Sequence, residues 1–278
     1  MTKRIAISTA LILMLLAIVS TAQTNGSVDW INRVVKAKGI GAPNPNMPEA
    51  AARPAAIRAA QQLALRNALE LIKGMNLNSQ TTIKNSMVEN DVVNTSVNGF
   101  VSGFTFEPSP HYMNDGTVEI EVTLPIDGQS GLGGVIFAES SPFSPKQVAP
   151  VAAAPKAYTS SPSAAGYTGL IVDARGLGIK PALMPKILSE ADREIYGSAN
   201  ISRDFAIQFG MCGYAKTPES AKALTDRIGN NPMVVKAMKV SGANKADIIL
   251  AKAEADAVQS AAKTSKFLAE CRVVVLLD

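Results

Sequence analysis

Few residues in this chain have the chemistry of an active site. His111, in SPHYMND, is the only histidine, and Cys212 and Cys271 are the only cysteines. These three residues form no pair at C-x-x-C or H-x-x-x-H spacing, so a zinc site is not expected. A Ser/His or Cys/His catalytic pair would have to use His111, which lies beside a turn, where a solvated histidine is the ordinary case. We therefore expect no catalytic residue and no metal site.

Carboxylates and glycine-rich runs give weak signals. Glu119 and Glu121 share one face of an expected strand about 7 Å apart, which is typical of a solvated sheet face as well as of an acid/base pair. The run ARGLGIKP lacks the third glycine of a dinucleotide loop, and GQSGLGG lacks the G-K-[S/T] of a phosphate loop. The sequence thus predicts no cofactor and favours a protein that is not an enzyme.

Asp173 and Arg175 are the best candidates for a ligand or interaction site. They lie in IVDARGLG, at the end of an expected strand. Loops at the ends of rigid elements often carry function. A structural ion pair between the two side chains is the alternative.

Cys212 and Cys271 are candidates for a disulfide, since an exported chain meets an oxidising environment. The alternative is two buried free thiols that act as small apolar residues. Both cysteines are flanked by strand-like sequence, FAIQFGMCGYA and ECRVVVLL. We predict that these two strands are neighbours in one sheet.

Residues 1–22 have the features of a secretory signal peptide. Lys3 and Arg4 precede an apolar run from Ala10 to Val19, and small residues Ser20 and Ala22 precede a cleavage point before Gln23. Retention as a membrane anchor is the alternative. No later segment could span a bilayer, and no cysteine at the cleavage point could carry a lipid. The mature chain would keep 25 basic and 23 acidic residues, without a basic cluster, so nucleic-acid binding is not expected.

The rest of the chain divides into two domains joined by a linker. Residues 127–166 are rich in Pro, Ala, Ser and Gly, which predicts an extended linker between domains at 27–126 and 167–278. Within it, GLGGVIFAE at 131–139 is an apolar segment expected to dock on its own domain. A partner protein is the other surface on which it could dock.

The first domain is expected to have the order strand, helix, helix, strand, strand. An opening strand in DWINRVVKAKGIGAP precedes a long helix in PEAAARPAAIRAAQQLALRNALELIKGMNL, at 48–77. Its most strongly patterned part is 58–74, where Ala60, Ala64 and Ala68 form a small-residue ridge. Pro54 is expected to break or kink this helix near its start. A second helix is expected over 81–99. Strands over 100–106 and 118–124 then flank a turn at 114–116, and the alanine ridge covers the resulting antiparallel sheet.

The second domain mixes strands and helices without regular alternation. Strands are expected in YTGLIVDARG, REIYG, FAIQFGMCGYA, MVVKAMKVSGA, ADIILAK and CRVVVLLD, and helices in TPESAKALTDRIG and EADAVQSAAKTSKFLAE. Thr217 is the expected cap of the first of these helices. Both domains are therefore predicted to be small α/β-sandwich-like folds of the α+β class.

Three segments of the first domain, ALRNALELIKG, NGFVSGF and DGTVEIEVTLPI, resemble a known family. The match is to the twenty-kilodalton bacterial surface lipoprotein family, which is related to the amino-terminal domain of flagellar assembly protein T. The resemblance implies a bacterial envelope module concerned with assembly or surface contacts. It supplies no catalytic residues, and the chain departs from it in lacking the lipid-attachment cysteine.

These observations favour a non-enzymatic exported protein, periplasmic or associated with the outer membrane. It would act in cell-envelope or flagellum-associated assembly through contacts with envelope or flagellar proteins, or by self-association. The alternative is a periplasmic small-ligand-binding or hydrolytic protein with a site between the domains, near Asp173 and Arg175.

Overall fold

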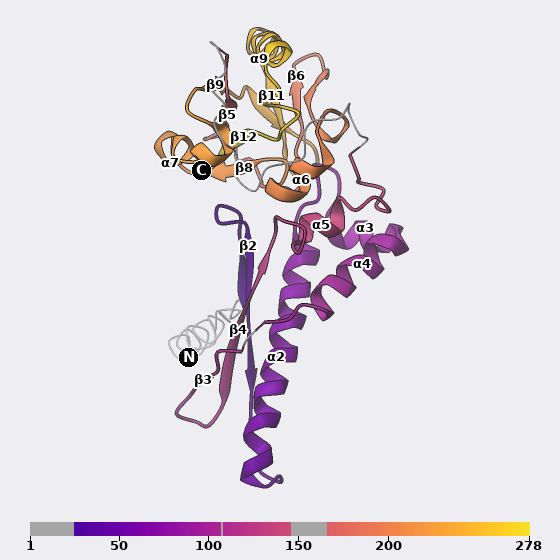
Figure 1. The fold of residues 1–278 in the computed structure, drawn as a ribbon, viewed down its shortest axis with the longest axis vertical. Coiled ribbons are helices and arrows are strands. Elements are labelled where there is room, and N and C mark those ends of the chain that lie inside the picture. The colour runs from indigo at the N-terminus through magenta and orange to yellow at the C-terminus, as the bar shows by residue number, and fades with distance from the viewer. Residues whose placement is uncertain (1–24, 107, 146–165) are drawn as a thin grey trace, which may run out of the picture.

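The computed structural model describes residues 25–106, 108–145 and 166–278. The expected signal peptide at 1–22 lies outside these residues. The N-terminal domain is an elongated two-layer body that projects away from the rounder C-terminal domain (Figure 1). Both domains contain helices and sheets, which confirms the predicted α+β class with an antiparallel sheet in the first domain. Within the described residues, no helix combines the length and apolar character needed to cross a membrane.

The N-terminal sheet has four antiparallel strands in the order β1-β2-β4-β3. Their bounds are Gly26–Asp29 for β1, Val34–Gly41 for β2, His111–Tyr112 for β3 and Val118–Pro125 for β4. Strands β2 and β4 pair along their whole length. In both strands every second residue is buried, and the residues between them lie on a more exposed face. A turn with Gly116 in the left-handed region (φ 84°) joins β3 to β4, where the sequence predicted it.

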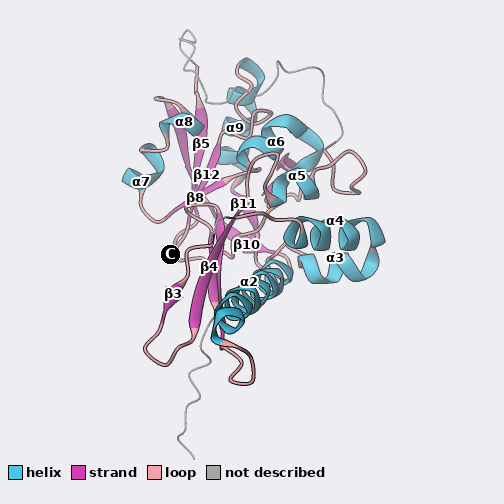
Figure 2. Ribbon diagram, turned by 60° about the horizontal axis from the view of Figure 1, so that its bottom comes forward, coloured by secondary structure: helices cyan, strands magenta, loops and turns pink. Residues whose placement is uncertain are grey.

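Helix α2, Glu49–Gly74, covers the buried face of this sheet (Figure 2). Its buried residues recur at every fourth position and are Ala52, Ala56, Ala60, Ala64, Ala68 and Ile72. This confirms the predicted alanine ridge. Close approach also requires two glycines in β2, because a Cβ at Gly39 would lie 2.1 Å from the Ala60 carbonyl oxygen, and one at Gly41 would lie 2.0 Å from that of Ala56.

The expected break at Pro54 does not occur, and α2 runs without interruption through most of the segment predicted to be helical. Pro54 is the sixth residue of α2 and is exposed. A proline removes one backbone hydrogen bond, and near an exposed helix end the carbonyl released can be solvated instead. The packing of the alanine ridge on the sheet therefore outweighs the effect of Pro54, and the helix continues through it.

The region after α2 also differs from the expectation. The single helix expected over 81–99 is two helices, α3 (Ile83–Glu89) and α4 (Asp91–Ser102), because the Asn90 side chain caps α4 by accepting hydrogen bonds from two backbone N–H groups. The strand expected over 100–106 is wrong, since Phe100 and Val101 belong to α4. The helical spacing of Val93, Val97 and Val101 buries one face of α4 and outweighs the apolar alternation that follows.

Residues 127–145, expected to begin the linker, are folded instead. They include the short helix α5, Leu132–Ile136, which contacts α4 of the first domain and α6 (Arg203–Phe209) of the second. Leu132, Ile136 and the following Phe137 are buried, so the apolar segment docks within its own chain. The remaining part of the expected linker, 146–165, lies outside the described residues.

The C-terminal domain contains two four-stranded sheets. One is parallel, in the order β8-β12-β5-β9, and the other is mixed, in the order β10-β11-β6-β7. The strands are β5 Gly169–Asp173, β6 Ile187–Ser189, β7 Glu194–Tyr196, β8 Gly213–Ala215, β9 Pro232–Lys236, β10 Lys239–Ser241, β11 Asp247–Leu250 and β12 Val273–Leu276. The remaining helices are η1 Ser198–Asn200, α7 Pro218–Lys222, α8 Thr225–Ile228 and α9 Lys252–Thr264.

The predicted neighbours β8 and β12 pair directly, with Gly213 opposite Val274. The strand expected over FAIQFGMCGYA is only partly right, because its first half forms α6 and only its end forms β8. Gly210, in the left-handed region (φ 71°), ends the helix and turns the chain into the strand. Thr217 caps α7 as predicted, in a capping box with Ser220.

Candidate functional site at the junction of the two domains

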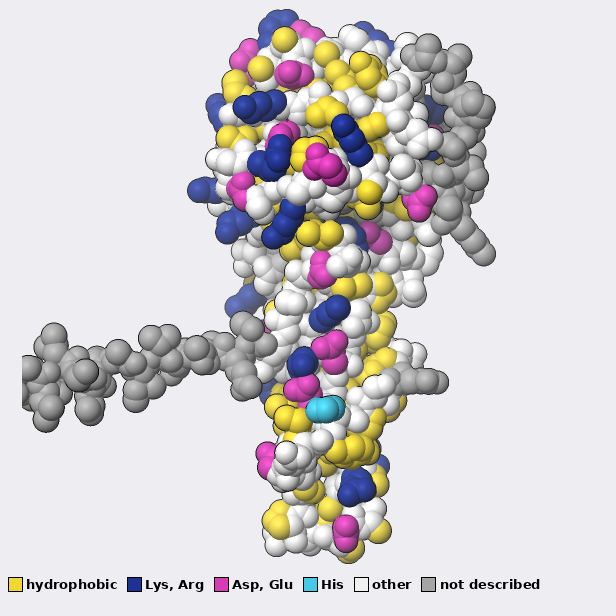
Figure 3. Space-filling view, turned by 90° about the vertical axis from the view of Figure 1, so that its left-hand side faces the viewer, with side chains coloured by type: hydrophobic (Ala, Val, Ile, Leu, Met, Phe, Trp, Pro, Cys, Tyr) yellow, Lys and Arg dark blue, Asp and Glu magenta, His cyan; other side chains and the backbone are white. Residues whose placement is uncertain are grey.

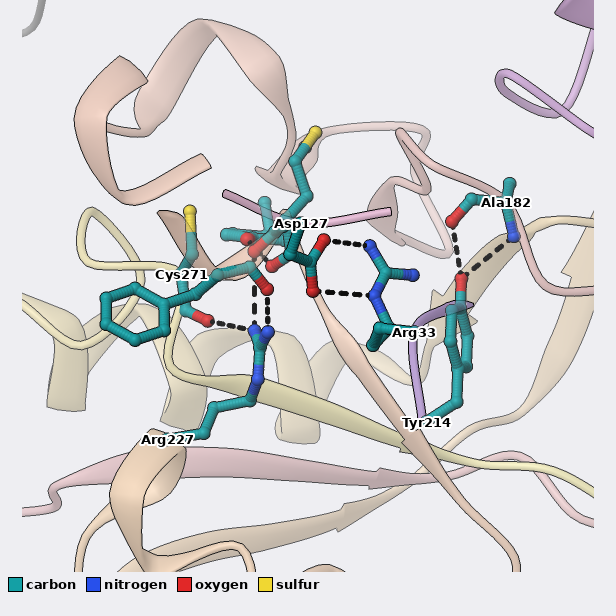
Figure 4. Close-up of polar contacts among 10 residues, drawn as sticks. Arg33, Asp127, Ala182, Tyr214, Arg227 and Cys271 are labelled. Atoms are coloured by element: carbon teal, nitrogen blue, oxygen red, sulfur yellow. Dashed lines mark hydrogen bonds and ion pairs between the residues drawn. The ribbon is translucent and has the colours of Figure 1, made fainter. Parts of the chain in front are cut away.

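A buried ion pair lies where the two domains meet. Arg33, in the turn between β1 and β2, donates two hydrogen bonds to the carboxylate of Asp127, which follows β4: Nε to Oδ2 at 2.9 Å and Nη2 to Oδ1 at 2.7 Å (Figure 4). The side chains are only 11% and 18% exposed. Burial alone would lower the pKa of Arg33, but the adjacent Asp127 carboxylate raises it above its usual value. The Arg33 guanidinium therefore stays protonated beside the carboxylate.

The C-terminal domain closes over this ion pair. A Cβ at Gly210 would lie 2.4 Å from Arg33 Nη2 and 2.6 Å from Asp127 Oδ1, so only glycine fits at the end of α6. Beside it, the Trp30 ring makes an edge contact with Tyr214 (centroids 5.8 Å apart), and the Arg33 guanidinium lies 5.7 Å from the centre of the Trp30 ring. Aromatic and cationic groups of both domains thus share one cluster.

A second arginine completes the junction from the C-terminal side. Arg227 donates from Nη1 to the carbonyls of Gly210 (3.3 Å) and Cys271 (2.9 Å), and from Nη2 to that of Phe209. Figure 4 shows Arg227 and Arg33 on either side of the same chain segment. Positive charge at the end of α6 suits the carbonyls that a helix C-terminus leaves unpaired. Arg227 therefore fixes the segment that covers the ion pair.

The loop after α2 makes a separate set of contacts with the C-terminal domain. Backbone N–H groups of Leu183 and Met184 donate to the carbonyls of Asn76 (3.1 Å) and Leu77 (2.7 Å). The buried Ser79 hydroxyl also bonds to the buried carboxylate of Asp247. A single hydrophobic core runs through both domains. The two domains are thus held together by hydrogen bonds and shared apolar packing around the buried ion pair.

Cys212 and Cys271 are buried free thiols, so the disulfide considered from the sequence is not formed. Cys212 contacts Tyr214, whereas Cys271 contacts Tyr196. Although the strands that follow them are neighbours, each thiol is directed to a different tyrosine. Burial raises the pKa of Cys212 and raises that of Cys271 to about 12, which keeps both sulfurs protonated and unreactive at neutral pH.

Asp173 and Arg175, the candidates for a ligand site, bond to each other. Arg175 donates from Nε to Asp173 Oδ1 at 2.9 Å and from Nη2 to Oδ2 at 2.6 Å. This hydrogen bonding lowers the pKa of the Asp173 carboxyl and raises that of Arg175. Both groups lie at the surface. Their mutual pairing matches the structural alternative considered from the sequence.

The other residues singled out from the sequence lie on the outer face of the N-terminal sheet. His111 is opposite Glu119 in the β3–β4 pair, and Lys38 Nζ lies 2.9 Å from Glu119 and 3.9 Å from Glu121. Basic and acidic side chains alternate along this face near His111 (Figure 3). Lys38 thus neutralises both carboxylates on a solvated surface. No cluster of three or more metal-ligating side chains occurs among the described residues.

Two cavities flank the junction. The first, of about 390 Å³, is lined by β1, the end of α2 and residues 180–181, with Trp30 and Leu71 in its wall. The second, of about 400 Å³, lies among Asn78, Phe143, Met184 and neighbouring residues. Both volumes are within the range of ligand pockets in proteins.

The sequence analysis missed the residues that make the junction. Arg33 and Asp127 are 94 positions apart, and Asp127 fell in the expected linker. A local signal was present, because each is a charged residue directly beside a short apolar run at one end of a strand, in NRVV and LPID.

Residues 169–278 match the family model described as the second domain of Tp0624 from Treponema pallidum. No curated protein matches the chain. The match covers the C-terminal domain and less than half of the chain.

Proposed function

We propose that this protein is a non-enzymatic, exported component of the bacterial cell envelope that acts in envelope or flagellum-associated assembly through protein contacts. The observation that carries the proposal is the junction. In it, Arg33 of the first domain pairs with Asp127, and Arg227 and Tyr214 of the second domain bond to backbone carbonyls of the segments that cover this pair. Such a junction fixes the domains as one extended body, which suits a protein that holds partners at defined positions.

Three further observations support export and an envelope role. The first 22 residues have the charge and hydropathy of a secretory signal. The first domain resembles a bacterial surface lipoprotein family. The second domain matches a domain of a Treponema pallidum protein, so both halves are similar to bacterial proteins.

Cell fractionation with amino-terminal sequencing tests the proposal. We expect a periplasmic or outer-membrane-associated species whose first residue is near Gln23. In the matched control, Lys3 and Arg4 are replaced by glutamate, which removes the positive charge that precedes the apolar run. This variant should accumulate uncleaved in the cytoplasm. A wild-type protein found full-length in the cytoplasm would contradict the proposal.

The alternative, a small-ligand-binding or hydrolytic protein with a site near Asp173 and Arg175, has less support. Those side chains pair with each other at the surface, and the lining of the cavity beside Trp30 does not include them. Partners of the proposed assembly protein would be envelope or flagellar proteins, or a second copy of the chain.

A further inference from the structure

The cavity beside Trp30 is a groove between a sheet edge and a helix. One wall is Val28 of β1 together with Trp30, and the other is Leu71 and Gly74 at the end of α2. Lys180 and Pro181 of the C-terminal domain close one end. The walls are mostly apolar, and the side chains of Val28, Trp30 and Leu71 are half-buried. An apolar side chain of a ligand would therefore gain by entering the groove.

Strand β1 supplies unpaired backbone groups along the groove. It is the outermost strand of its sheet, and within the described part of the chain it pairs only with β2. An edge strand offers N–H and C=O groups that can pair with another extended chain. A groove between an edge strand and a helix is suited to an added peptide strand, whose alternate side chains would face the helix.

One acidic and one basic side chain lie at the rim of the groove, and only the acidic one has an ion-pair partner among the described residues. Glu70 is an acidic residue in the lining, and hydrogen bonding to Lys73 lowers the pKa of its carboxyl, with Lys84 and Arg66 also near enough to act on it. Lys180 is exposed and forms no ion pair with any described residue. An acidic ligand would be attracted to this rim.

We propose that this groove binds an extended, acidic and apolar peptide segment of a partner protein. The segment adds a strand to β1, places an apolar side chain between Trp30 and Leu71, and directs a carboxylate to Lys180. This inference rests on the proposed function, since it identifies where an assembly partner docks and what chemistry it presents.

Gly74 allows the groove to be filled without disturbing the core. A Cβ at Gly74 would meet no heavy atom within 4 Å, so a leucine there extends into the open space that a ligand would occupy. Gly99 in α4 is a matched control, because it is also an exposed helical glycine with no heavy atom within 4 Å of an added Cβ, but it does not line the groove. Charge reversal at exposed Lys180 tests the rim separately.

Trp30 is the only tryptophan of the chain, so its fluorescence reports directly on the groove. The probe is a peptide in which valine and aspartate alternate. It has about eight residues, which is a usual strand length. It is titrated into the purified full chain. The comparison peptide carries lysine in place of aspartate. We expect the acidic peptide to change the Trp30 emission saturably, and the basic peptide to bind at least about tenfold more weakly.

Variants then assign the binding to the groove. Gly74→Leu should weaken binding about tenfold or more, Gly99→Leu should leave it unchanged, and Lys180→Glu should reverse the preference between the two peptides. Circular dichroism checks that each variant is folded. If Gly74→Leu does not fold, the preference of the Lys180→Glu variant decides the question alone.

Several outcomes would overturn the inference. The first is a Trp30 emission that does not change with the acidic peptide at about 1 mM. The second is an equal loss of peptide affinity in Gly74→Leu and Gly99→Leu. The third is a Lys180→Glu variant that still prefers the acidic peptide to the basic one. A dimer that Gly74→Leu dissociates would assign the groove to a second copy of the chain. None of these results depends on fractionation, so failure of the groove and failure of export are distinguishable.

Discussion

Two interfaces stabilise this molecule, and they differ in the kind of side chains that form them. Helix α2 meets its sheet through alanines and through Gly39 and Gly41, with backbone against backbone. The domain junction instead places the Arg33–Asp127 ion pair, with Arg227 and its carbonyl partners, in a buried position. The first interface has almost no polar side chains, and the second is built around charged ones.

The difference predicts opposite responses to mutation. Close contact between backbones depends on side-chain volume, so a single added methyl group should matter there. A buried ion pair adds little stability over a well-packed apolar pair, but removing one partner leaves a charge without compensation. Side-chain volume should thus determine how a substitution at the helix–sheet interface changes stability, and the balance of buried charge should determine it at the junction.

The largest effect is expected at the junction. Asp127→Ala leaves the buried Arg33 guanidinium without its carboxylate, and should lower the free energy of unfolding by about 3–5 kcal/mol. Chemical denaturation at neutral pH measures the change.

The control replaces both partners, as Arg33→Met with Asp127→Leu. Because no charge is then left unpaired, most of the lost stability should return. A double variant as unstable as Asp127→Ala would show that packing, not charge balance, limits the junction.

A smaller effect is expected where α2 meets the sheet. Gly39→Ala places a methyl group against the backbone of α2 and should destabilise by about 1–3 kcal/mol. Gly99→Ala is the same substitution at an exposed position of helix α4, and it should stabilise the protein by about 0.5–1 kcal/mol because alanine favours the helix. Thermal denaturation, monitored by circular dichroism, shows whether each variant is less or more stable than the wild type. A stabilising Gly39→Ala would mean that the two layers are not in close contact.

The junction should also lose stability in alkaline solution. Burial raises the pKa of Cys271 from its ordinary 9.0 to about 12, and those of Cys212, Tyr196 and Tyr214 also lie above their ordinary values. A group whose pKa is higher in the folded state stabilises the fold fully below its unfolded pKa, and this contribution disappears as the pH rises. Stability should therefore fall between about pH 9 and 12, with Cys271 contributing about 1 kcal/mol of the loss at pH 10.

Urea denaturation at several pH values measures this slope. Cys271→Ala should make the slope shallower, even if the variant is less stable at pH 7. The slope should not vanish, because Cys212 and the two tyrosines still titrate. A wild-type stability that is constant from pH 8 to pH 11 would contradict the burial of these groups.

Alkylation decides the state of the two cysteines in the protein. Two labels should be added after unfolding without reductant, and none in the folded protein, because Cys212 and Cys271 are buried free thiols. Mass measurement counts the labels. An unfolded chain that accepts no label without reductant would reveal a disulfide.

The sequence predicted those parts of the fold that depend on local pattern. The alanine ridge of α2 and the capping of α7 by Thr217 follow from spacing and side-chain type within one turn. The adjacency of β8 and β12 followed from two apolar runs that each required a buried position. The errors arose where local patterns compete, as at 100–106, where helical spacing that begins at Val93 outweighs later alternation.

The junction could not be predicted in the same way. Its ion pair joins residues 94 positions apart, and the carboxylate of Asp127 lies beyond the last strand of its own domain, where composition indicated a linker. Whether such a charge is solvated or buried depends on how the second domain covers it. That information comes from the fold and not from the neighbouring sequence.

The smallest effect is expected on the exposed face of the same sheet that α2 covers. Lys38 lies 2.9 Å from Glu119, but its side chain is 47% exposed, so solvent screens the attraction and the pair gains little over two hydrated charges. Lys38→Ala should therefore leave the denaturation midpoint unchanged within error at moderate ionic strength. The variant shares strand β2 with Gly39, one residue away on the opposite face, so the two substitutions compare the covered and open sides of one strand. A loss of stability as large as that of Gly39→Ala would mean that another surface covers this face, and a partner or second copy would then have to be sought there.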